Sequence, residues 1–502
     1  MENFYFNLAG GINQNSTKTE LGMNTKNIYW SDAENVEIYQ SKGIIRQKGN
    51  VLIEQIPNNE EIIGLHEMKY GSKHQLIIAT VSGKLYLNNN GTLKLLDKQL
   101  HSDKISFTNF LNGTIVSGNK DEMFFIKNND NFDIVDCNLK KSDKTPVFSE
   151  VVTVYKGRIW VADDSTIYFS ALGSYQDFTT ENDAGYISDF YTDTDKILAL
   201  KTYKDYLAIY KENSTYLLSG STPEDFAIVP FADKGSCSQK SIVSVNNKQY
   251  FFTSGIYTLE VGELNQIQLG SEITHLIKEE FNKFDTSRNN EIFALNYEEK
   301  NQIWYFIPYK SDQYFHTIWI NDIVNKAWYK RVLPQDITTA CVFEKKILTA
   351  DKNGKIYQEN INNTFNGEPI QFIWKSPFLS LGNPTVRKTI DEFYFILDES
   401  YENNFNYSIF KNYDSENKDD KDFIYSSNIQ NLIWSKDNST LELNDKWSDE
   451  NGEAIWALDV ESMYKAEISE ANYAIQLCVE GNKIENNLAI IGLQFKEIYC
   501  ED

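Results

Sequence analysis

The chain contains few of the residues that mark metal-binding or disulfide-rich proteins. Among its 502 residues there are only five cysteines and five histidines. The cysteines form no C-x-x-C pair, and an odd, scattered set in a long chain indicates reduced thiols; they are Cys137, Cys237, Cys341, Cys478 and Cys500. The histidines show no paired metal-ligand spacing; they are His66, His74, His101, His275 and His316. We therefore expect no metal, no cofactor and no disulfide framework.

Sequence motifs of catalysis are also missing. The chain has no G-x-S-x-G elbow, no P-loop and no G-x-G-x-x-G. Cys237 in "GSCS" has the look of a nucleophile, but no histidine lies near it in sequence, and a small-residue turn explains the pattern. The pairs Asp163-Asp164 and Asp193/Asp195 lie in predicted turns, and with 72 acidic residues in the chain such pairs carry little weight. We predict that the protein is not an enzyme and assign no catalytic, cofactor-binding or metal-binding residue.

Long apolar runs and positive charge are in short supply. No segment approaches the roughly 18 apolar residues that span a bilayer, and the start, "MENFYFNLAGGINQNS", lacks the basic and apolar regions of a secretion signal. With 48 Lys and Arg against 72 Asp and Glu, the net charge is −24. Such a balance disfavours wrapping of DNA or of an anionic membrane, because both need cations to neutralise phosphates. It suits a soluble protein, or one lining a path along which DNA slides without sticking.

Aromatic residues are abundant, and they recur in a repeated phrase. Tyr and Phe, 30 of each, favour strands, where flat rings pack on pleated neighbours. The stretches "YKGRIWVADDSTIYFSALG" (155–173) and "YKDYLAIYKENSTYLLSG" (203–220) share one plan. Each runs from an aromatic-Lys pair through a turn and an apolar strand to a polar turn and a second strand. An acidic residue and a phenylalanine then follow in both, as Asp177-Phe178 and Asp225-Phe226.

Looser copies extend this phrase into about seven units, spaced roughly 40 to 50 residues apart, which is typical of four-stranded propeller blades. They begin near Tyr70, Phe110, Asn246, Glu299 and Phe343. Turns such as "SGK" at 82–84 and "KNGK" at 352–355 place Gly where positive φ is needed. One hairpin alone is marginal in water, whereas radial sheets bury their faces against one another. The alternative is an unrelated run of β-meanders in a sandwich.

The pattern predicts an all-β chain with three parts. Residues 1–34 form an N-terminal arm that orders on assembly, and 35–367 form a β-propeller of six or seven blades. Within it, the strand-like segment 35–56 is expected to pair with the last unit, 336–361, and close the ring. Residues 368–502 form a C-terminal β-sandwich of about seven or eight strands. Its tryptophans are expected in the core; they are Trp434, Trp447 and Trp456.

One segment breaks the β pattern. In "GSEITHLIKEEFNKF" (270–284) the apolar residues fall at helical spacing, and Ser271 stands at the N-cap position. We predict a short amphipathic helix that packs on its own domain, with a partner subunit as the alternative contact.

Three patches resemble the tail hub and nozzle-type proteins of tailed bacteriophages, also known as packaged-DNA stabilisation or tail accessory proteins. "NVEIYQSKGIIRQKGN" (35–50) looks like their opening strand, which often ends in Arg-Pro-Gly; here Gln47-Lys48-Gly49 follow Arg46, a departure. The segment 165–260 is the best match, and "WKSPFLSLGNPTVRKTIDEFYF" (374–395) looks like the strand pair that opens their C-terminal domain. The resemblance covers most of the chain through patterns, without one exact signature.

The resemblance implies a structural virion protein of the tail or neck, assembled in the host cytoplasm. Its expected partners are copies of itself in a ring of six, the portal or neck adaptor proteins, other tail proteins, and genomic DNA that passes through the lumen without sequence-specific binding. The ring would extend the portal channel and retain or pass DNA, and carboxylates on its lumen would repel the DNA. The family brings no catalytic residues. The alternative function is a carbohydrate-binding or glycosidase-like β-propeller, in which the aromatic residues would stack on sugars.

Overall fold

The computed structural model describes residues 2–17, 20–21, 27–89, 91–188, 195–262, 266–398, 400–414, 416, 418–425, 461–466 and 471–500. The chain divides into two compact units. Unit 1 comprises Met1–Gly49, Asn321–Val332 and Asn362–Asp502. Unit 2 comprises Asn50–Ile320 and Leu333–Ile361.

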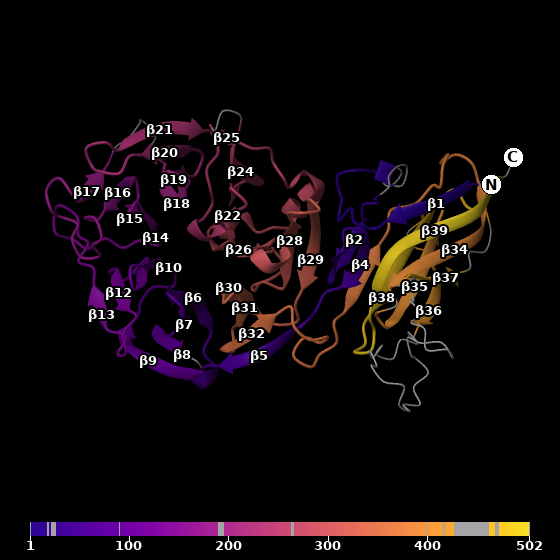
Figure 1. Ribbon diagram of the computed structural model, residues 1–502, viewed down its shortest axis with the longest axis horizontal. Coiled ribbons are helices and arrows are strands. Elements are labelled where there is room, and N and C mark those ends of the chain that lie inside the picture. Colours follow the sequence, from indigo (N-terminus) through magenta and orange to yellow (C-terminus); the bar gives the residue numbers. More distant parts are fainter. Residues whose placement is uncertain are drawn as a thin grey trace, which may run out of the picture. The chain divides into compact units, whose positions relative to one another are not determined.

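Unit 2 is a set of antiparallel meanders arranged around a common axis (Figure 1). In chain order we name them blades 1 to 7. Blade 1 holds β6 (Ile62–Tyr70), β7 (Lys73–Thr80), β8 (Lys84–Asn89) and β9 (Thr92–Gln99). Blade 2 holds β10 (Ile105–Phe110), β11 (Gly113–Gly118), β12 (Phe124–Lys127) and β13 (Ile134–Asp136). Blade 3 holds β14 (Val151–Tyr155), β15 (Arg158–Asp163), β16 (Thr166–Phe169) and β17 (Gly185–Ile187).

The remaining blades continue the same pattern. Blade 4 holds β18 (Ile197–Tyr203), β19 (Tyr206–Lys211), β20 (Thr215–Ser219) and β21 (Ala227–Ala232), and blade 5 holds β22 (Val243–Val245), β23 (Lys248–Phe252), β24 (Ile256–Val261) and β25 (Ile267–Leu269). Blade 6 holds β26 (Phe293–Tyr297), β27 (Gln302–Phe306) and β28 (Thr317–Asp322). Blade 7 holds β30 (Ile337–Phe343), β31 (Lys346–Asp351), β32 (Lys355–Glu359) and β5 (Asn50–Gln55). Short 3-10 turns accompany them: η1 (Pro57–Asn59), η2 (Gln239–Ser241), η4 (His275–Asn282), η5 (Thr286–Glu291) and η6 (Glu298–Lys300).

The ring is closed by a strand from the start of unit 2. β5 pairs antiparallel with β32, so the last blade takes its outer strand from residues that precede the first blade. The buried Glu359 carboxylate accepts a hydrogen bond from Asn50 Nδ2 at 3.0 Å, across 309 residues of sequence. An apolar cluster joins blade 7 to blade 1, with Leu348 and Ile356 against Ile62 and Ile78. Unit 2 is therefore a seven-bladed β-propeller, within the range predicted from the repeat.

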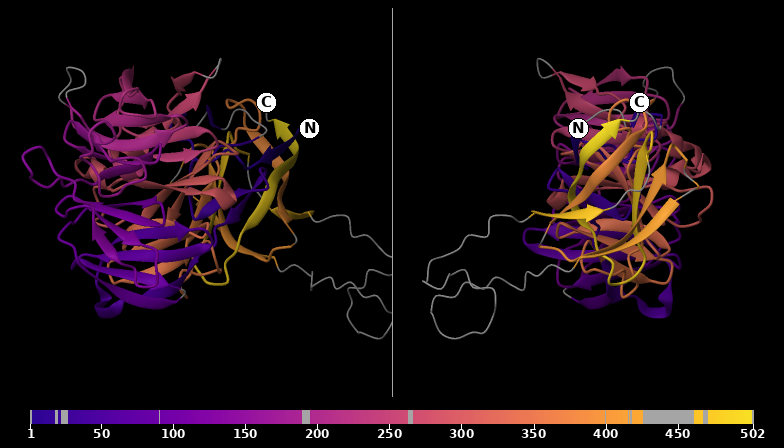
Figure 2. Two further views of the ribbon diagram at one scale, coloured as in Figure 1. Left: turned by 60° about the vertical axis from the view of Figure 1, so that its left-hand side comes forward. Right: turned by 90° about the vertical axis from the view of Figure 1, so that its right-hand side faces the viewer.

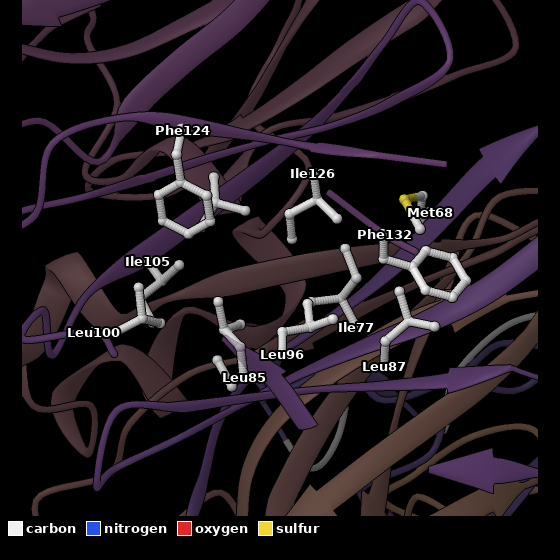
Figure 3. Packing of buried hydrophobic residues seen from close by; sticks show 12 residues of the cluster. Met68, Ile77, Leu85, Leu87, Leu96, Leu100, Ile105, Phe124, Ile126 and Phe132 are labelled. Atoms are coloured by element: carbon white, nitrogen blue, oxygen red, sulfur yellow. The ribbon is translucent and has the colours of Figure 1, made fainter. Parts of the chain in front are cut away.

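Neighbouring blades bury their faces against one another. Figure 3 shows the cluster between blades 1 and 2, where Ile77, Leu85 and Leu87 meet Ile105 and Phe124. Similar clusters join blades 2 and 3, 3 and 4, and 4 and 5. Burial of this apolar area at roughly 25 cal/mol per Å² is what makes a radial array stable where one hairpin is not.

The repeated phrase places a hydrogen-bonded link between successive blades. Tyr155 Oη lies 2.7 Å from the carbonyl oxygen of Asp205, in the first turn of blade 4, and Lys156 Nζ lies 3.1 Å from the carboxylate of the same residue. In the next copy, Tyr203 Oη donates to Asn247 O at 2.6 Å, and Lys204 Nζ donates to the Asn247 side chain at 2.6 Å. In blades 3 and 4 the Tyr-Lys pair thus joins the first turn to the equivalent turn of the following blade.

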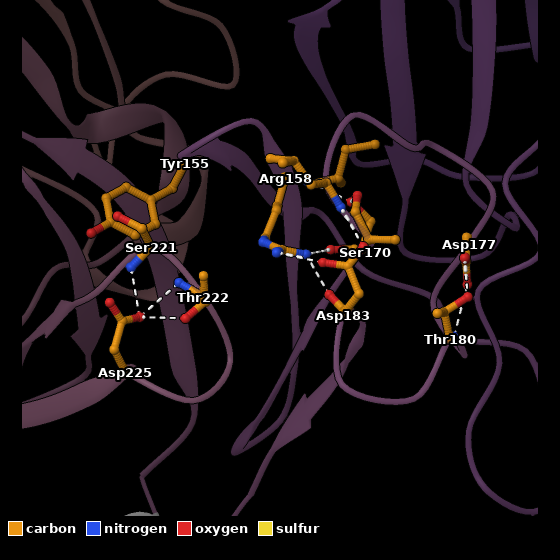
Figure 4. A network of polar contacts seen from close by, with 12 residues as sticks. Tyr155, Arg158, Ser170, Asp177, Thr180, Asp183, Ser221, Thr222 and Asp225 are labelled. Atoms are coloured by element: carbon orange, nitrogen blue, oxygen red, sulfur yellow. Dashed lines mark hydrogen bonds and ion pairs between the residues drawn. The ribbon is translucent and has the colours of Figure 1, made fainter.

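The acidic residues of the acidic-Phe pairs each stabilise a turn (Figure 4). Asp225 accepts hydrogen bonds from the amides of Ser221 and Thr222, at 2.8 and 2.7 Å, and so fixes the loop that leads into β21. The ring of Phe226 then packs across the blade boundary on Trp160 at a centroid distance of 5.1 Å. In the other copy, Asp177 accepts hydrogen bonds from the amides of Thr179 and Thr180, which follow it in the chain, at 3.0 and 2.9 Å. Both carboxylates are turn caps.

Unit 1 is a β-sandwich of two sheets. The first has the order β3-β4-β39-β34-β37 with β1 on β39, and within unit 1 the second runs β29-β2-β33-β38-β35-β36. Their bounds are β1 (Glu2–Asn7), β2 (Asp32–Glu34), β3 (Val36–Tyr39), β4 (Gly43–Arg46), β29 (Ala327–Val332), β33 (Phe372–Lys375), β34 (Lys388–Asp398), β35 (Asn403–Lys411), β36 (Lys418–Tyr425), β37 (Glu461–Ala466), β38 (Ile475–Gly481) and β39 (Ala489–Cys500). The long strands β34 and β39 lie side by side, orange and yellow in Figure 2. Phe395 of the first sheet packs on Phe405 of the second at 5.6 Å, which places the core between the sheets.

The boundaries of this unit correct the predicted domains. Residues 1–34 are not a separate arm, because β1 pairs with β39 and β2 lies between β29 and β33. The segment 35–56 divides: β5 belongs to the propeller, whereas β3 and β4 belong to the sandwich. Residues 368–502 supply seven of the described strands, and the chain start and β29 complete the sheets. Trp434, Trp447, Trp456 and Asp193 lie outside the described residues.

The predicted amphipathic helix is only partly correct. The segment is helical at η4, but as a kinked 3-10 turn with Thr274 at its N-cap in place of Ser271. Phe281 and Phe284 pack on one another at 5.0 Å, and Phe281 stacks on Phe252 of blade 5. The stripe therefore packs on its own domain.

Candidate functional site: the axial channel of the propeller

The largest cavities described in unit 2 lie on the propeller axis. Cavity A, of about 560 Å³, is lined by residues at the beginnings of the inner strands, such as Glu61, Val151 and Ile197. Cavity B, of about 520 Å³, is lined by residues further along the same strands, such as Lys201 and Val342. Each is lined from all seven blades, so the two form successive parts of one axial channel.

The two cavities share a ring of residues that we call the waist: Ser106, Gln239, Lys240, Phe293 and Thr339. Gln239 holds the waist together, because its Nε2 donates to Val152 O at 3.0 Å and to Leu200 O at 2.9 Å while its Oε1 accepts from Leu200 N at 2.8 Å. Its amide thus bridges blades 3, 4 and 5 and has no N–H donor left for a ligand. The hydroxyls of Ser106 and Thr339 make no hydrogen bond within the described chain, and both residues are buried.

Cavity A is rich in carboxylates, most of them ion-paired. The pairs are Asp103–Lys120 at 3.1 Å, Asp163–Lys141 at 2.5 Å, Asp164–Lys196 at 3.4 Å and Glu291–Arg288 at 2.6 Å. Two further acids, Glu61 and Glu150, line the same cavity. Burial raises the pKa of Glu61, against the opposing effect of Lys352. This end of the channel therefore presents negative charge.

Cavity B has the opposite balance. Lys201 and Lys240 line it, and neither forms an ion pair or hydrogen bond with any described residue. Its one carboxylate, Glu67, binds His74 Nδ1 at 2.8 Å and the amide of Glu344 at 2.8 Å. His66 stacks on Phe107 at 5.3 Å, and burial lowers its pKa to about 4, so the imidazole is neutral at pH 7. The lysines are thus the local source of charge.

The residues that the sequence singled out do not assemble into a catalytic site. Cys237 lines cavity A, but burial raises the pKa of its thiol to about 12, whereas a reactive cysteine needs a lowered pKa. His101 and His316 each bind a separate aspartate at 2.9 Å, Asp121 and Asp336. His275 is exposed, near the carbonyl of Glu272 at 3.4 Å.

The described residues lack two further features. Among them, no group of three or more His, Cys, Asp or Glu side chains is placed to hold a metal ion. No helix in the described part of the chain is long and apolar enough to cross a membrane.

Sequence reasoning missed the channel lysines. Lys201 stands in the alternating strand "ILALKTY" and Lys240 in the turn "SQKS", where each resembles a solvated surface residue. The only available signal was position, because Lys201 lies on the first strand of its repeat unit, and the first strand of a propeller blade faces the axis. That inference needs the blade count and register in advance.

The topology defines the class of protein: a seven-bladed β-propeller chain with a β-sandwich unit. The sequence matches no family model and no curated protein. Among solved structures, it is similar to YCF48 from Cyanidioschyzon merolae, with 11% identity, a TM-score of 0.40, and coverage of 61% of this chain and 98% of the other. BamB from Moraxella catarrhalis gives 11% identity, a TM-score of 0.37, and coverage of 65% and 94%. BBS1N, solved in complex with ARL6DN, gives 9% identity, a TM-score of 0.40, and coverage of 63% of this chain and 98% of the other. At this level the matches carry no argument, and the fold assignment rests on the sheet topology.

Proposed function

We propose that the protein is a structural virion component of a tailed bacteriophage, a subunit of an oligomeric ring in the tail or neck that extends the portal channel and retains or passes DNA. Its partners would be copies of itself, the portal or neck adaptor proteins, other tail proteins and the DNA in the lumen. The ring order of six is part of the same proposal.

The observation that carries this proposal is the outer rim of the propeller. In blades 1 to 5 and in blade 7, the outermost strand is paired on one side only, which leaves a hydrogen-bonding edge open. Five of these strands also expose a large apolar side chain; they are Ile53 at 45%, Leu95 at 55%, Tyr186 at 57%, Val229 at 50% and Leu269 at 38%. Open edges with apolar side chains are suited to contacts between subunits.

The placement of the three resembling patches supports the proposal as well. The first patch forms β3 and β4, and Gly49 at its end lies so close to Thr364 that a Cβ would fall 1.9 Å from the Thr364 carbonyl oxygen. Glycine is therefore needed where the family motif has one, although Pro is absent before it. The last patch covers β33 and β34, and the middle patch covers strands of blades 3 to 5.

Native mass spectrometry and negative-stain imaging of the full chain, alone and with the portal–neck assembly, test the proposal. We expect rings in at least one of these samples. The variants Leu95→Lys and Val229→Lys should weaken ring formation, whereas Val81→Lys, in the exposed turn between β7 and β8, should not. A chain that remains monomeric in both samples would refute the proposal.

The carbohydrate alternative gains no support from the aromatic residues. All six tryptophans within the described residues are fully buried: Trp30, Trp160, Trp304, Trp319, Trp328 and Trp374. They serve packing, and a glycan site needs aromatic walls open to a pocket.

A further inference from the structure

The waist of the propeller channel combines one positive charge with two hydroxyl donors that have no partner. Lys240 lies at the waist, between Lys104 in cavity A and Lys201 in cavity B. Ser106 and Thr339, from blades 2 and 7, line the same level. Phe293 gives this ring an apolar wall.

We propose that the waist binds an oxyanion of the phosphate type, as inorganic phosphate or as one group of a short linear polyphosphate. Lys240 supplies the charge, and the hydroxyls of Ser106 and Thr339 donate to the oxygens. Lys104 and Lys201 extend the site along the channel in both directions. Nothing in this assignment depends on ring assembly.

The cost of the unpaired lysines is the first argument. An ammonium group surrounded by protein is unfavourable unless a partner compensates it. The Lys240 side chain is exposed and lines both cavities. Partial loss of hydration in the channel lowers its pKa, Glu150 raises that pKa and Lys104 lowers it. Burial also lowers the pKa of Lys201. A bound anion would favour the charged form of both lysines, which is a reason for a chain with an excess of acids to keep lysines here.

The hydroxyls are the second argument. Buried polar side chains normally find a hydrogen-bond partner, and the neighbouring Thr338 does so, since its hydroxyl donates to Ile62 O at 2.6 Å. Ser106 and Thr339 form no such bond with a described residue, although both are more than nine-tenths buried. Hydrogen bonds to a charged acceptor are the stronger kind, so an oxyanion uses these donors well.

The charge pattern sets the direction of entry. The carboxylates of cavity A would repel an approaching anion, even though four of them are ion-paired. Cavity B offers two free lysines and a single carboxylate that is already hydrogen-bonded. Its volume of about 520 Å³ lies within the range of small-ligand sites. An anion therefore reaches the waist through cavity B.

Isothermal titration calorimetry of the full chain with phosphate, pyrophosphate and tripolyphosphate, at constant ionic strength set with NaCl, tests the proposal. We expect binding that tightens with chain length, because each further phosphate reaches Lys201 or Lys104. Lys240→Met should weaken binding roughly 10- to 100-fold, and Ser106→Ala or Thr339→Val roughly 3- to 10-fold each. The matched control is Lys196→Met, since Lys196 lines cavity A but pairs with Asp164 and is largely exposed; it should change affinity by less than about twofold.

Thermal unfolding of the same variants separates loss of the site from loss of the fold. Lys240→Met should be about as stable as the native chain without ligand, because the Lys240 side chain is exposed to the channel, and tripolyphosphate should no longer raise its melting temperature. Absence of binding by all three anions at millimolar concentration would overturn the proposal. So would equal affinity of the native chain and a folded Lys240→Met variant.

Discussion

The two units differ in how far apart their paired strands lie in the sequence. In the propeller, hydrogen-bonded strands are neighbours in sequence within every blade, with the single described exception of β5 on β32. In the sandwich, partners come from distant parts of the chain: Ile44 of β4 pairs with Ile490 of β39, and Glu34 of β2 pairs with Lys330 of β29. The propeller repeats one locally paired sheet, whereas the sandwich forms only when segments hundreds of residues apart pair with one another.

This difference has consequences for folding. Local strand pairs close short loops and form early, whereas distant pairs wait until the intervening chain is ordered. The blades are therefore expected to form as near-independent sheets that then pack together. The sandwich requires the start of the chain, β29 and the C-terminal strands at once.

Deleting residues 1–49 should have the largest effect, because it should unfold the sandwich and leave the propeller blades folded. It removes β2 and β4, which each lie between two strands in the interior of a sheet. We expect hydrogen-exchange protection to be lost throughout β34, β38 and β39, with protection in blades 1 to 5 retained. Deletion of residues 1–7 is the control, because β1 pairs only with β39, and its effect should stay local. Full protection of β34 after the larger deletion would contradict the dependence on distant segments.

The ring closure should respond differently from the other blade interfaces. Ile356 at the closure and Ile167 between blades 3 and 4 are both fully buried in equivalent clusters. Each substitution by Ala should destabilise by about 2 to 5 kcal/mol. Ile356→Ala should mainly accelerate unfolding, since its contacts require the two ends of the propeller to meet and form last. Ile167→Ala should slow folding to a greater extent, since blades 3 and 4 are consecutive in the chain and pack together before the ring closes. Stopped-flow kinetics measure both, and the reverse pattern would refute early local blades.

Acid should weaken the propeller through His66. Its folded pKa is about 4, below the value near 6.5 of an unfolded chain. Between these values the unfolded state binds more protons, so this stabilising contribution is complete above about pH 6.5 and falls as the pH drops towards 4. His66→Gln should remove about 1 to 3 kcal/mol of that pH dependence.

Denaturant titrations of the two chains at pH 7 and pH 5 measure this difference. His275→Gln, at an exposed position, is the matched control and should follow the native chain. An unchanged acid slope in His66→Gln would show that the channel wall does not hold a neutral imidazole.

The Tyr-Lys links should have the smallest effect. Tyr155→Phe and Tyr203→Phe each remove one hydroxyl that joins neighbouring blades, which should cost about 0.5 to 1.5 kcal/mol. Tyr70→Phe is the control, since Tyr70 occupies the same turn of blade 1 and is 53% exposed. Chemical denaturation should rank the control nearest to the native chain. A larger loss of unfolding free energy in Tyr70→Phe than in the other two variants would refute the role of the Tyr hydroxyls as links between blades.

The sequence was sufficient for the propeller because its signals are local. The paired phrases at Tyr155 and Tyr203 gave the blade, and the turns at Gly83 and Gly354 do adopt positive φ, 84° and 72°. The helix at 270–284 was only partly right, because helical spacing does not distinguish a kinked 3-10 turn from an α-helix. The arm at 1–34 was wrong, since polar composition and a Gly-Gly pair do not reveal a strand partner near residue 495.

The candidate site could not be predicted from local sequence patterns. Lys201, Lys240 and Ser106 come from different blades, and no spacing in the sequence relates them. Their common feature is that they face one axis, which exists only once all the blades have closed.

By itself, the sequence determined the all-β class, the repeat and the turns, because strand alternation and turn chemistry act over a few residues. Only the tertiary structure decided which strand closes the ring, which segments build the sandwich, and which lysines stand unpaired in the channel. Those outcomes depend on the free energy of burying distant surfaces together, and a pattern read along the chain does not record that quantity.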